Sequence, residues 1–215
     1  MNSDRHTKSA CVGIAGMIAA GLAFLAGNGC GQHQDTKFEN SRYSALGEIV
    51  AAKVNELGGG KGRLVLVVAE RDNNQPTAFG QTVAAFRKTL DKSFQVSVET
   101  VVTSAVAFSG SDPLSVDKFT ALLQNNADAD YLISFVGVPV LTPVQIDQLP
   151  SPRPPVVEVV AYNPPTKAMF AKKVVCLAAL NKPAAQGSDA TGSSLEIFDA
   201  CYQLASPETA VSLPR

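Results

Sequence analysis

The strongest constraint on the fold is the run Arg63-Leu-Val-Leu-Val-Val-Ala69, in which leucine and valine follow one another without polar residues between them. A strand that faces water on one side alternates apolar and polar residues, whereas a strand covered on both faces reads as a continuous apolar run. Such strands occur mainly in parallel sheets with helices on both sides. The run therefore predicts a central strand of an α/β domain.

Helical and strand patterns alternate around this run. Apolar residues recur at helical spacing over 43–57, 79–90 and 116–126, and Ser115 is the expected cap of the third of these helices. One helical turn is expected before Leu149. A short helix is expected over 167–172, and a closing helix over 195–204. Further strands are predicted over 94–103, 131–136, 155–162 and 174–180. Strands joined through helices run parallel with right-handed crossovers. We therefore predict a three-layer, doubly wound parallel sheet of about five strands, similar to the Rossmann type, in the order 2-1-3-4-5.

The N-terminal residues have a different character from the rest of the chain. Arg5 and Lys8 precede an uncharged apolar run from Ala10 to Cys30, and a basic start followed by an apolar stretch is typical of a secretory signal. Two alternatives are an uncleaved membrane helix, since about 20 apolar residues span a bilayer, and an ordinary signal cut after small residues. The predicted organisation is a signal peptide over 1–29, a polar tether over 30–40 and a single α/β domain over 41–215.

Gly29 and Cys30 resemble the lipobox of bacterial lipoproteins, in which leucine and small residues precede an obligatory cysteine. Asn28 and Gly27 depart from that pattern, and Leu25 lies further upstream than its leucine. The resemblance implies that the signal is removed and that Cys30 carries the lipid. It also implies a membrane-anchored protein of the cell envelope or periplasm, with an N-terminal transmembrane anchor as the alternative location.

Composition and reactive residues argue against several functions. The net charge of −1 predicts no basic surface for nucleic acid. The only histidines, His6 and His33, precede the predicted domain, so a Ser-His-Asp or Cys-His device is not available within it. No metal or cofactor motif is present, and we predict no catalytic residues and no enzyme activity. Outside the cytoplasm Cys176 and Cys201 could form a disulfide, or they could be buried thiols.

In an open parallel sheet, ligands bind beyond the carboxyl ends of the strands. The polar and loop residues expected at this edge are Glu70, Arg71, Asp72, Asn73, Thr103, Ser104, Gly137 and Asn163. They are the candidate ligand-binding residues, and the alternative is ordinary solvated loop surface. A second candidate contact is the apolar loop over 139–144, which either meets a protein partner or packs over the sheet edge.

Two segments resemble one lobe of the type I periplasmic binding proteins, the sugar and amino-acid receptors of bacterial import systems. They are Gly60-Lys-Gly-Arg-Leu-Val-Leu-Val-Val68 and Asn125-Asn-Ala-Asp-Ala-Asp-Tyr-Leu-Ile-Ser-Phe-Val-Gly137. The resemblance covers about 60–182, and those receptors close two lobes around a ligand whereas this chain supplies one. It implies a non-enzymatic binding or interaction module, for a small solute or an envelope protein. The alternatives are a structural or assembly protein of the envelope without a ligand pocket, and an unrecognised enzyme.

The lipidation hypothesis makes a direct prediction for Cys30→Ser. We expect the wild-type chain, expressed in a bacterial host, to gain the mass of a lipid and to fractionate with membranes. Both properties should disappear in Cys30→Ser, because the thiol is the attachment point. Intact-mass measurement and membrane fractionation test this. Identical mass and location of the two proteins would contradict lipidation and leave a membrane anchor or a secreted domain.

Overall fold

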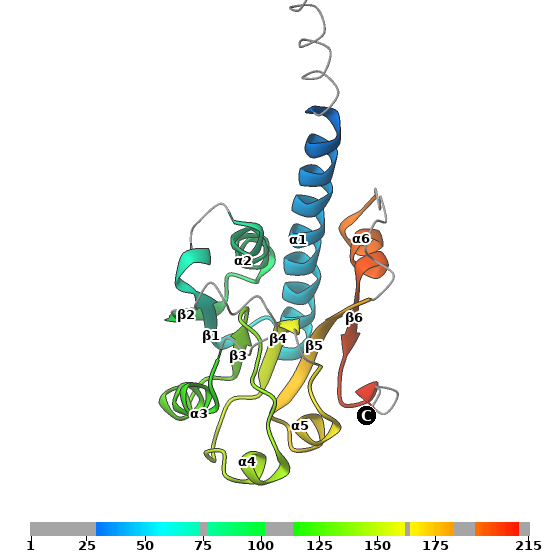
Figure 1. The fold of residues 1–215 in the computed structure, drawn as a ribbon. Helices are drawn as coiled ribbons and strands as arrows, with labels where there is room; N and C mark the ends of the chain where they lie inside the picture. The colour runs from blue at the N-terminus through cyan, green and yellow to red at the C-terminus, as the bar shows by residue number, and fades with distance from the viewer. Residues whose placement is uncertain (1–28, 74–76, 102–113, 162–163, 183–191, 211–215) are drawn as a thin grey trace, which may run out of the picture. The chain divides into compact units, whose positions relative to one another are not determined.

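The computed structural model describes residues 29–73, 77–101, 114–161, 164–182 and 192–210 (Figure 1). The chain divides into the units 1–37 and 38–215, and the sheet belongs to the second unit. The predicted signal lies almost wholly outside the described residues. Among the helices that are described, none is both long and apolar enough to cross a membrane.

A six-stranded sheet forms the middle layer. Its strands are β1 (Gly62–Ala69), β2 (Phe94–Val101), β3 (Tyr131–Ser134), β4 (Val156–Ala161), β5 (Val175–Asn181) and β6 (Tyr202–Ala205). Their order is β2-β1-β3-β4-β5-β6, and the first five strands are parallel. The α/β class is confirmed, and so is the predicted order of the five parallel strands.

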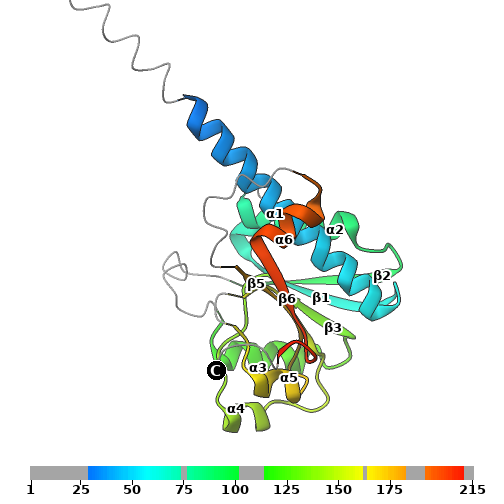
Figure 2. The same ribbon diagram turned by 90° about the vertical axis from the view of Figure 1, so that its right-hand side faces the viewer.

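Helices cover both faces of the sheet, as Figure 2 shows. They are α1 (Gly29–Gly58), α2 (Ala78–Thr89), α3 (Val116–Asn125), α4 (Pro143–Asp147), α5 (Lys167–Ala171) and α6 (Ser194–Cys201). One layer contains α1, α2 and α6, and the other contains α3, α4 and α5. The Ser115 side chain accepts a hydrogen bond from the Lys118 amide, which confirms the predicted cap of α3. Helix α1 is longer than the expected span 43–57 and includes residues 30–40, which the sequence assigns to a polar tether.

Strand β1 lies at the centre of two hydrophobic cores. Leu64, Leu66 and Val68 pack with the layer of α1, α2 and α6. Val67 and Ala69 pack with the layer of α3, α4 and α5. All of these side chains are buried, as the unbroken apolar run predicts.

The end of the chain differs from the sequence prediction. The sequence predicts a helix over 195–204, but α6 ends at Cys201 and β6 follows it directly. Strand β6 pairs antiparallel with β5, so that Asn181 is opposite Tyr202 and Ala178 is opposite Ala205. The four residues of β6 are too few to show a periodicity of their own. The open edge of β5 provides backbone partners that favour the extended form.

Cys176 and Cys201 are both thiols, so the disulfide considered from the sequence is not formed. The Lys182 amide donates to the Cys201 carbonyl at 2.9 Å, which places Cys201 beside the carboxyl end of β5. Cys176 lies six residues earlier on the same chain segment, which corresponds to roughly 20 Å along an extended strand. A disulfide requires Cα atoms within about 7 Å of each other.

Helices α1 and α2 pack closely because Gly47 has no side chain. An added Cβ at Gly47 would overlap the Thr82 carbonyl oxygen and would lie 2.9 Å from the Phe86 backbone nitrogen. Both neighbours are backbone atoms, which cannot move without displacing α2.

We expect Gly47→Ala to destabilise the fold by about 1–3 kcal/mol, because overpacking outweighs the gain of about 1 kcal/mol in helix propensity. Urea unfolding measures the change in the free energy of unfolding. Lys53→Ala on the same helix is the control, since this exposed side chain contacts only Glu56 and should change stability by no more than about 0.5 kcal/mol. Equal stability of Gly47→Ala and wild type would contradict the close contact.

Candidate functional site

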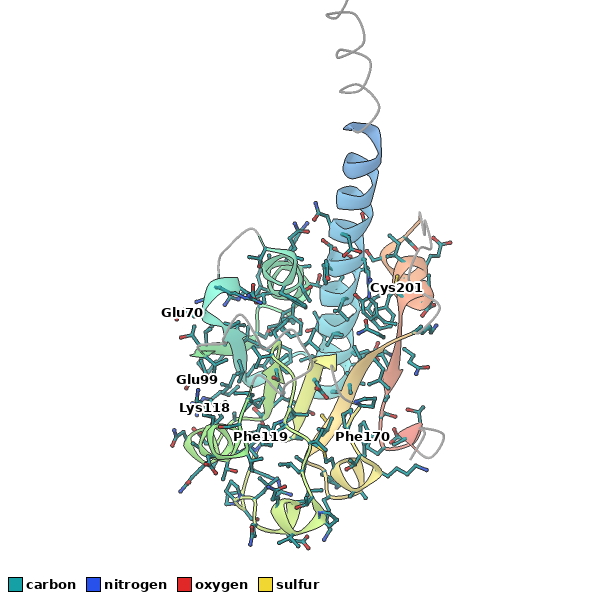
Figure 3. The ribbon with its side chains drawn as sticks, viewed as in Figure 1. Glu70, Glu99, Lys118, Phe119, Phe170 and Cys201 are labelled. Carbon is teal, nitrogen blue, oxygen red and sulfur yellow. The ribbon has the colours of Figure 1, made fainter. Side chains whose placement is uncertain are left out.

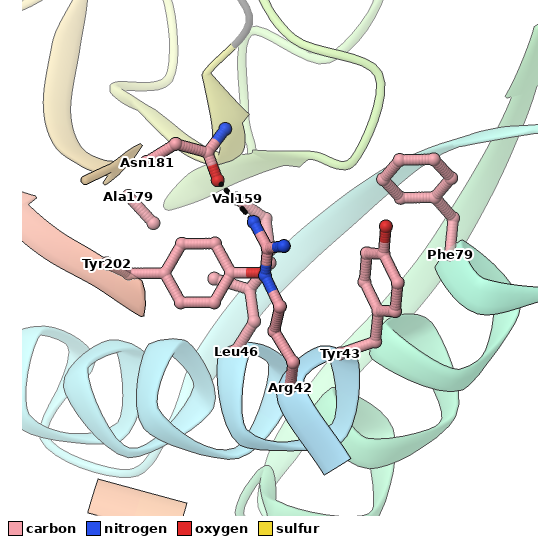
Figure 4. Close-up of a pocket in the computed structure, with 8 residues that line it drawn as sticks. All are labelled: Arg42, Tyr43, Leu46, Phe79, Val159, Ala179, Asn181 and Tyr202. Carbon is pink, nitrogen blue, oxygen red and sulfur yellow. Dashed lines mark hydrogen bonds between the residues drawn. The ribbon is translucent and has the colours of Figure 1, made fainter. Parts of the chain in front are cut away.

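A pocket of about 150 Å³ lies at the carboxyl ends of β4 and β5, beneath α1 (Figure 4). Its lining comes from elements far apart in the sequence: Arg42, Tyr43 and Leu46 on α1, Phe79 on α2, Val159 on β4, Ala179 and Asn181 on β5, and Tyr202 on β6. It therefore lies at the edge where α/β sheets bind ligands. It is the candidate functional site of this chain.

Among the described residues that line the pocket, Arg42 is the one that carries a charge. Its Nε donates to the Tyr202 hydroxyl oxygen at 2.9 Å, and its Nη2 donates to the Asn181 amide oxygen at 3.2 Å. Figure 4 shows the guanidinium between these two partners. It also lies over the Tyr202 ring, 5.2 Å from the ring centre. The Tyr43 ring centre lies 6.0 Å from it, so two hydrogen bonds and two aromatic rings hold the cation in place.

The pocket keeps Arg42 charged and Tyr202 neutral. Burial raises the pKa of Tyr202 to about 12, although the neighbouring Arg42 lowers it. Burial alone would lower the pKa of Arg42. Nearby groups, led by Tyr202, raise it by more than burial lowers it, so the pKa of Arg42 lies above its usual value. Burial also raises the pKa of Tyr43. The site therefore presents one fixed positive charge at neutral pH.

The rest of the lining is largely apolar. Tyr43 and Phe79 meet edge to face, with ring centres 5.4 Å apart. Leu46 of α1, Val159 of β4 and Ala179 of β5 are buried and form the aliphatic part of the wall. The eight lining residues include no carboxylate, histidine, serine or cysteine. The arrangement can bind a ligand, but these residues provide neither a general base nor a nucleophile of the usual kinds.

The first loop predicted from the sequence has a local structural role. Glu70, Arg71 and Asp72 form the short 3-10 helix η1 after β1. Asp72 is buried and accepts a hydrogen bond of 2.7 Å from the Thr77 hydroxyl, next to the start of α2. Asn73 accepts one from Arg87 at 3.3 Å. These four residues do not line the pocket, and Figure 3 shows Glu70 and Cys201 on opposite sides of the view. Their binding role stays a prediction.

Gly137 belongs to a buried turn after β3. Its φ of 82° lies in the left-handed region that favours glycine. Its carbonyl oxygen accepts a hydrogen bond from the Ser134 hydroxyl at 2.6 Å, and the next amide, of Val138, donates to Glu158 at 3.1 Å. Glu158 is buried within β4 and was not predicted as a partner of this turn. The signal that could have singled it out is that it is the one charged residue of an apolar strand. The predicted residues Thr103, Ser104 and Asn163 lie outside the described residues.

The pocket residues were missed because their meeting depends on long-range packing. Arg42 is one residue before the expected helix 43–57, and Tyr202 is in the predicted closing helix. Nothing in the local pattern connects two residues 160 positions apart. An arginine followed by a tyrosine at the polar start of an amphipathic helix is the weak signal that was present.

No group of three or more potential metal-ligating side chains was found within the described parts of the chain. No protein-family model matches the sequence, and no curated protein is detectably similar to it.

Solved structures do resemble the fold. An ABC transporter solute-binding protein from Burkholderia graminis, in complex with D-arabinose, aligns with 80% of this chain and 62% of its own, with a TM-score of 0.50 and 11% identity. The arabinose-binding protein AraP from Geobacillus stearothermophilus aligns with 79% of this chain and 62% of its own, with a TM-score of 0.47 and 11% identity. The chain thus spans less than two thirds of the length of either protein.

The class defined by these observations is an α/β domain with a mostly parallel six-stranded sheet. The fold is similar to that of ABC transporter solute-binding proteins, and the chain has a single lobe-like domain. The expected likeness to a lobe of the periplasmic binding proteins is confirmed at the level of the fold.

The raised pKa of Tyr202 predicts how stability depends on pH. An exposed tyrosine has a pKa of about 10, so the folded chain binds this proton more tightly than the unfolded chain. The contribution is present below about pH 10 and is lost as the pH rises toward 12. Tyr202→Phe should lack this loss, which a pKa difference of about two limits to roughly 3 kcal/mol. Urea unfolding of both proteins across this range tests it, and parallel pH profiles would contradict the shift.

Proposed function

We propose that this chain is a non-enzymatic binding module that holds a small solute in the pocket beneath Arg42. The observation that carries the proposal is the arrangement of that pocket. A cation is fixed by two neutral partners at the carboxyl edge of the sheet, and aromatic and aliphatic side chains form the walls. Ligand sites commonly combine an apolar lining with a few oriented polar groups.

The fold supports the proposal. The solute-binding protein from Burkholderia graminis that resembles this chain was solved with D-arabinose. In open α/β sheets the carboxyl edge is the usual place for a ligand, and the pocket lies at that edge. The alignment covers only 62% of the Burkholderia graminis protein. We therefore propose binding by one lobe rather than the closure of a complete two-lobed receptor.

We further propose that the module is exported and is anchored to a membrane of the cell envelope through a lipid on Cys30. The basic and apolar N-terminal sequence and the partial lipobox support this location. A tethered domain would hold its pocket near the membrane surface, where an import system takes up solutes.

A protein partner is the second candidate function. Val140 and Val144 are 50% and 65% exposed on the loop after β3 and on α4. Leu141 of the same loop is buried, which supports the packing alternative for part of the segment. An envelope protein could contact the two exposed valines without using the pocket.

Ala179→Val tests the pocket by partly filling it. Ala179 lines the pocket, whereas its neighbour Ala178 is buried in the core on the opposite face of β5. Ala178→Val is therefore the control, and we expect Ala178→Val and Ala179→Val each to destabilise the fold by about 1–3 kcal/mol. Only Ala179→Val should weaken the binding of solutes found by screening the purified full chain with sugars, amino acids and small organic acids, by at least about tenfold, or 1.4 kcal/mol. Equal loss in both variants, or no bound solute, would contradict the proposed site.

A further inference from the structure

The polar groups of Arg42, Asn181 and Tyr202 leave more hydrogen-bond donors than acceptors available in the pocket. The Tyr202 hydroxyl oxygen and the Asn181 amide oxygen both accept hydrogen bonds from Arg42. The hydrogens that remain for a ligand are the Tyr202 hydroxyl hydrogen, the Asn181 NH₂ and the other N–H groups of the guanidinium, and they outnumber the lone pairs that remain on the two oxygens. No described residue accepts a hydrogen bond from them. A ligand that satisfies these groups must therefore supply acceptors.

The charge of Arg42 points to the same kind of ligand. Its nearest carboxylate among the described residues is that of Glu39, one turn earlier on α1, at 3.9 Å from Nη1. That distance is too long for a hydrogen bond, and the Glu39 side chain is 46% exposed, so the pair contributes little. The Arg42 side chain is only 19% exposed. A partly buried cation with neutral partners favours an anionic ligand.

Size and lining restrict the anion. The pocket has a volume of about 150 Å³. An engineered apolar cavity of about that volume in another protein binds benzene, so a ligand of this size fits. Here one part of the lining is polar and the rest consists of Tyr43, Phe79 and aliphatic side chains. A carboxylate is acceptor-only when ionised and can take two hydrogen bonds from a guanidinium. A sugar hydroxyl is both donor and acceptor, so it matches this set of donors less well.

We infer that the pocket binds a small monocarboxylate with a compact apolar body, about the size of benzoate, through Arg42, Tyr202 and Asn181. This inference rests on the proposed function and names its class of solute. The carboxylate lies against the guanidinium and the two neutral donors, and the apolar body lies between the aromatic rings and the aliphatic wall.

The test uses radiolabelled benzoate as the probe and equilibrium dialysis of the full chain in a mild detergent at neutral pH. We expect saturable binding of benzoate. Benzamide, the neutral isostere, should compete at least about tenfold less well than unlabelled benzoate. Arg42→Gln should lower the affinity at least about tenfold. Lys53→Gln is the matched control, because it removes one positive charge from the same helix at an exposed position outside the pocket, and it should bind benzoate like wild type.

Tyr202→Phe provides a second variant that keeps the ring and removes only the hydroxyl. It should weaken benzoate binding about threefold to tenfold, and circular dichroism of each variant checks that it is folded. Benzoate binding that is the same in all variants, or equal competition by benzamide, overturns the inference. Inorganic phosphate that displaces benzoate with equal affinity also overturns it, because the pocket would then select anions in general.

A neutral aldopyranose tested in the same dialysis separates the inference from the proposed function. One outcome is that the sugar binds to the wild-type chain and not to Ala179→Val, while benzoate binds to neither. The pocket is then a solute site, and the carboxylate assignment is wrong. If neither probe binds and the solute screen with the full chain is also empty, the proposed function fails as well.

Discussion

Burial of β1 on both faces is the constraint on which the rest of the structure depends. Its leucine and valine side chains cannot be covered by one layer, so the chain must place helices on each side of the sheet. Helices α1, α2 and α6 satisfy one face, and α3, α4 and α5 satisfy the other. The same arrangement brings Arg42 and Tyr43 of α1 to the carboxyl edge of β4 and β5, where the pocket lies.

The candidate site follows from how that edge accommodates a charge. Arg42 comes from the helix that covers the apolar face, and its guanidinium needs hydrogen-bond acceptors that the aliphatic wall does not provide. Asn181 at the end of β5 and Tyr202 at the start of β6 supply them. Because β6 pairs antiparallel with β5, these two residues lie opposite each other in the register. Pairing of the last strand therefore completes the site.

The elements of the fold could be predicted from sequence because each has a local signal. The apolar run of β1 and the Ser115 cap of α3 are examples, and the order of the parallel strands follows from general rules for crossover connections. Strand β6 could not be predicted, since four residues show no periodicity and its extended form depends on the edge of β5. The pocket was missed for the same reason. Glu70 to Asn73 were predicted from their place after a strand, and their binding role stays a prediction. Asp72 accepts from Thr77 at the start of α2, and Asn73 accepts from Arg87 in its last turn.

The sequence by itself determined the class of fold and the central position of β1, because hydrophobic patterns act locally along the chain. Only the tertiary structure decided that Cys176 and Cys201 are too far apart to pair and that Arg42 meets Tyr202. These relations depend on strand register and on the packing of one helix layer against the sheet. Neither is encoded in any single segment, because both arise only when distant segments compete for the same surface.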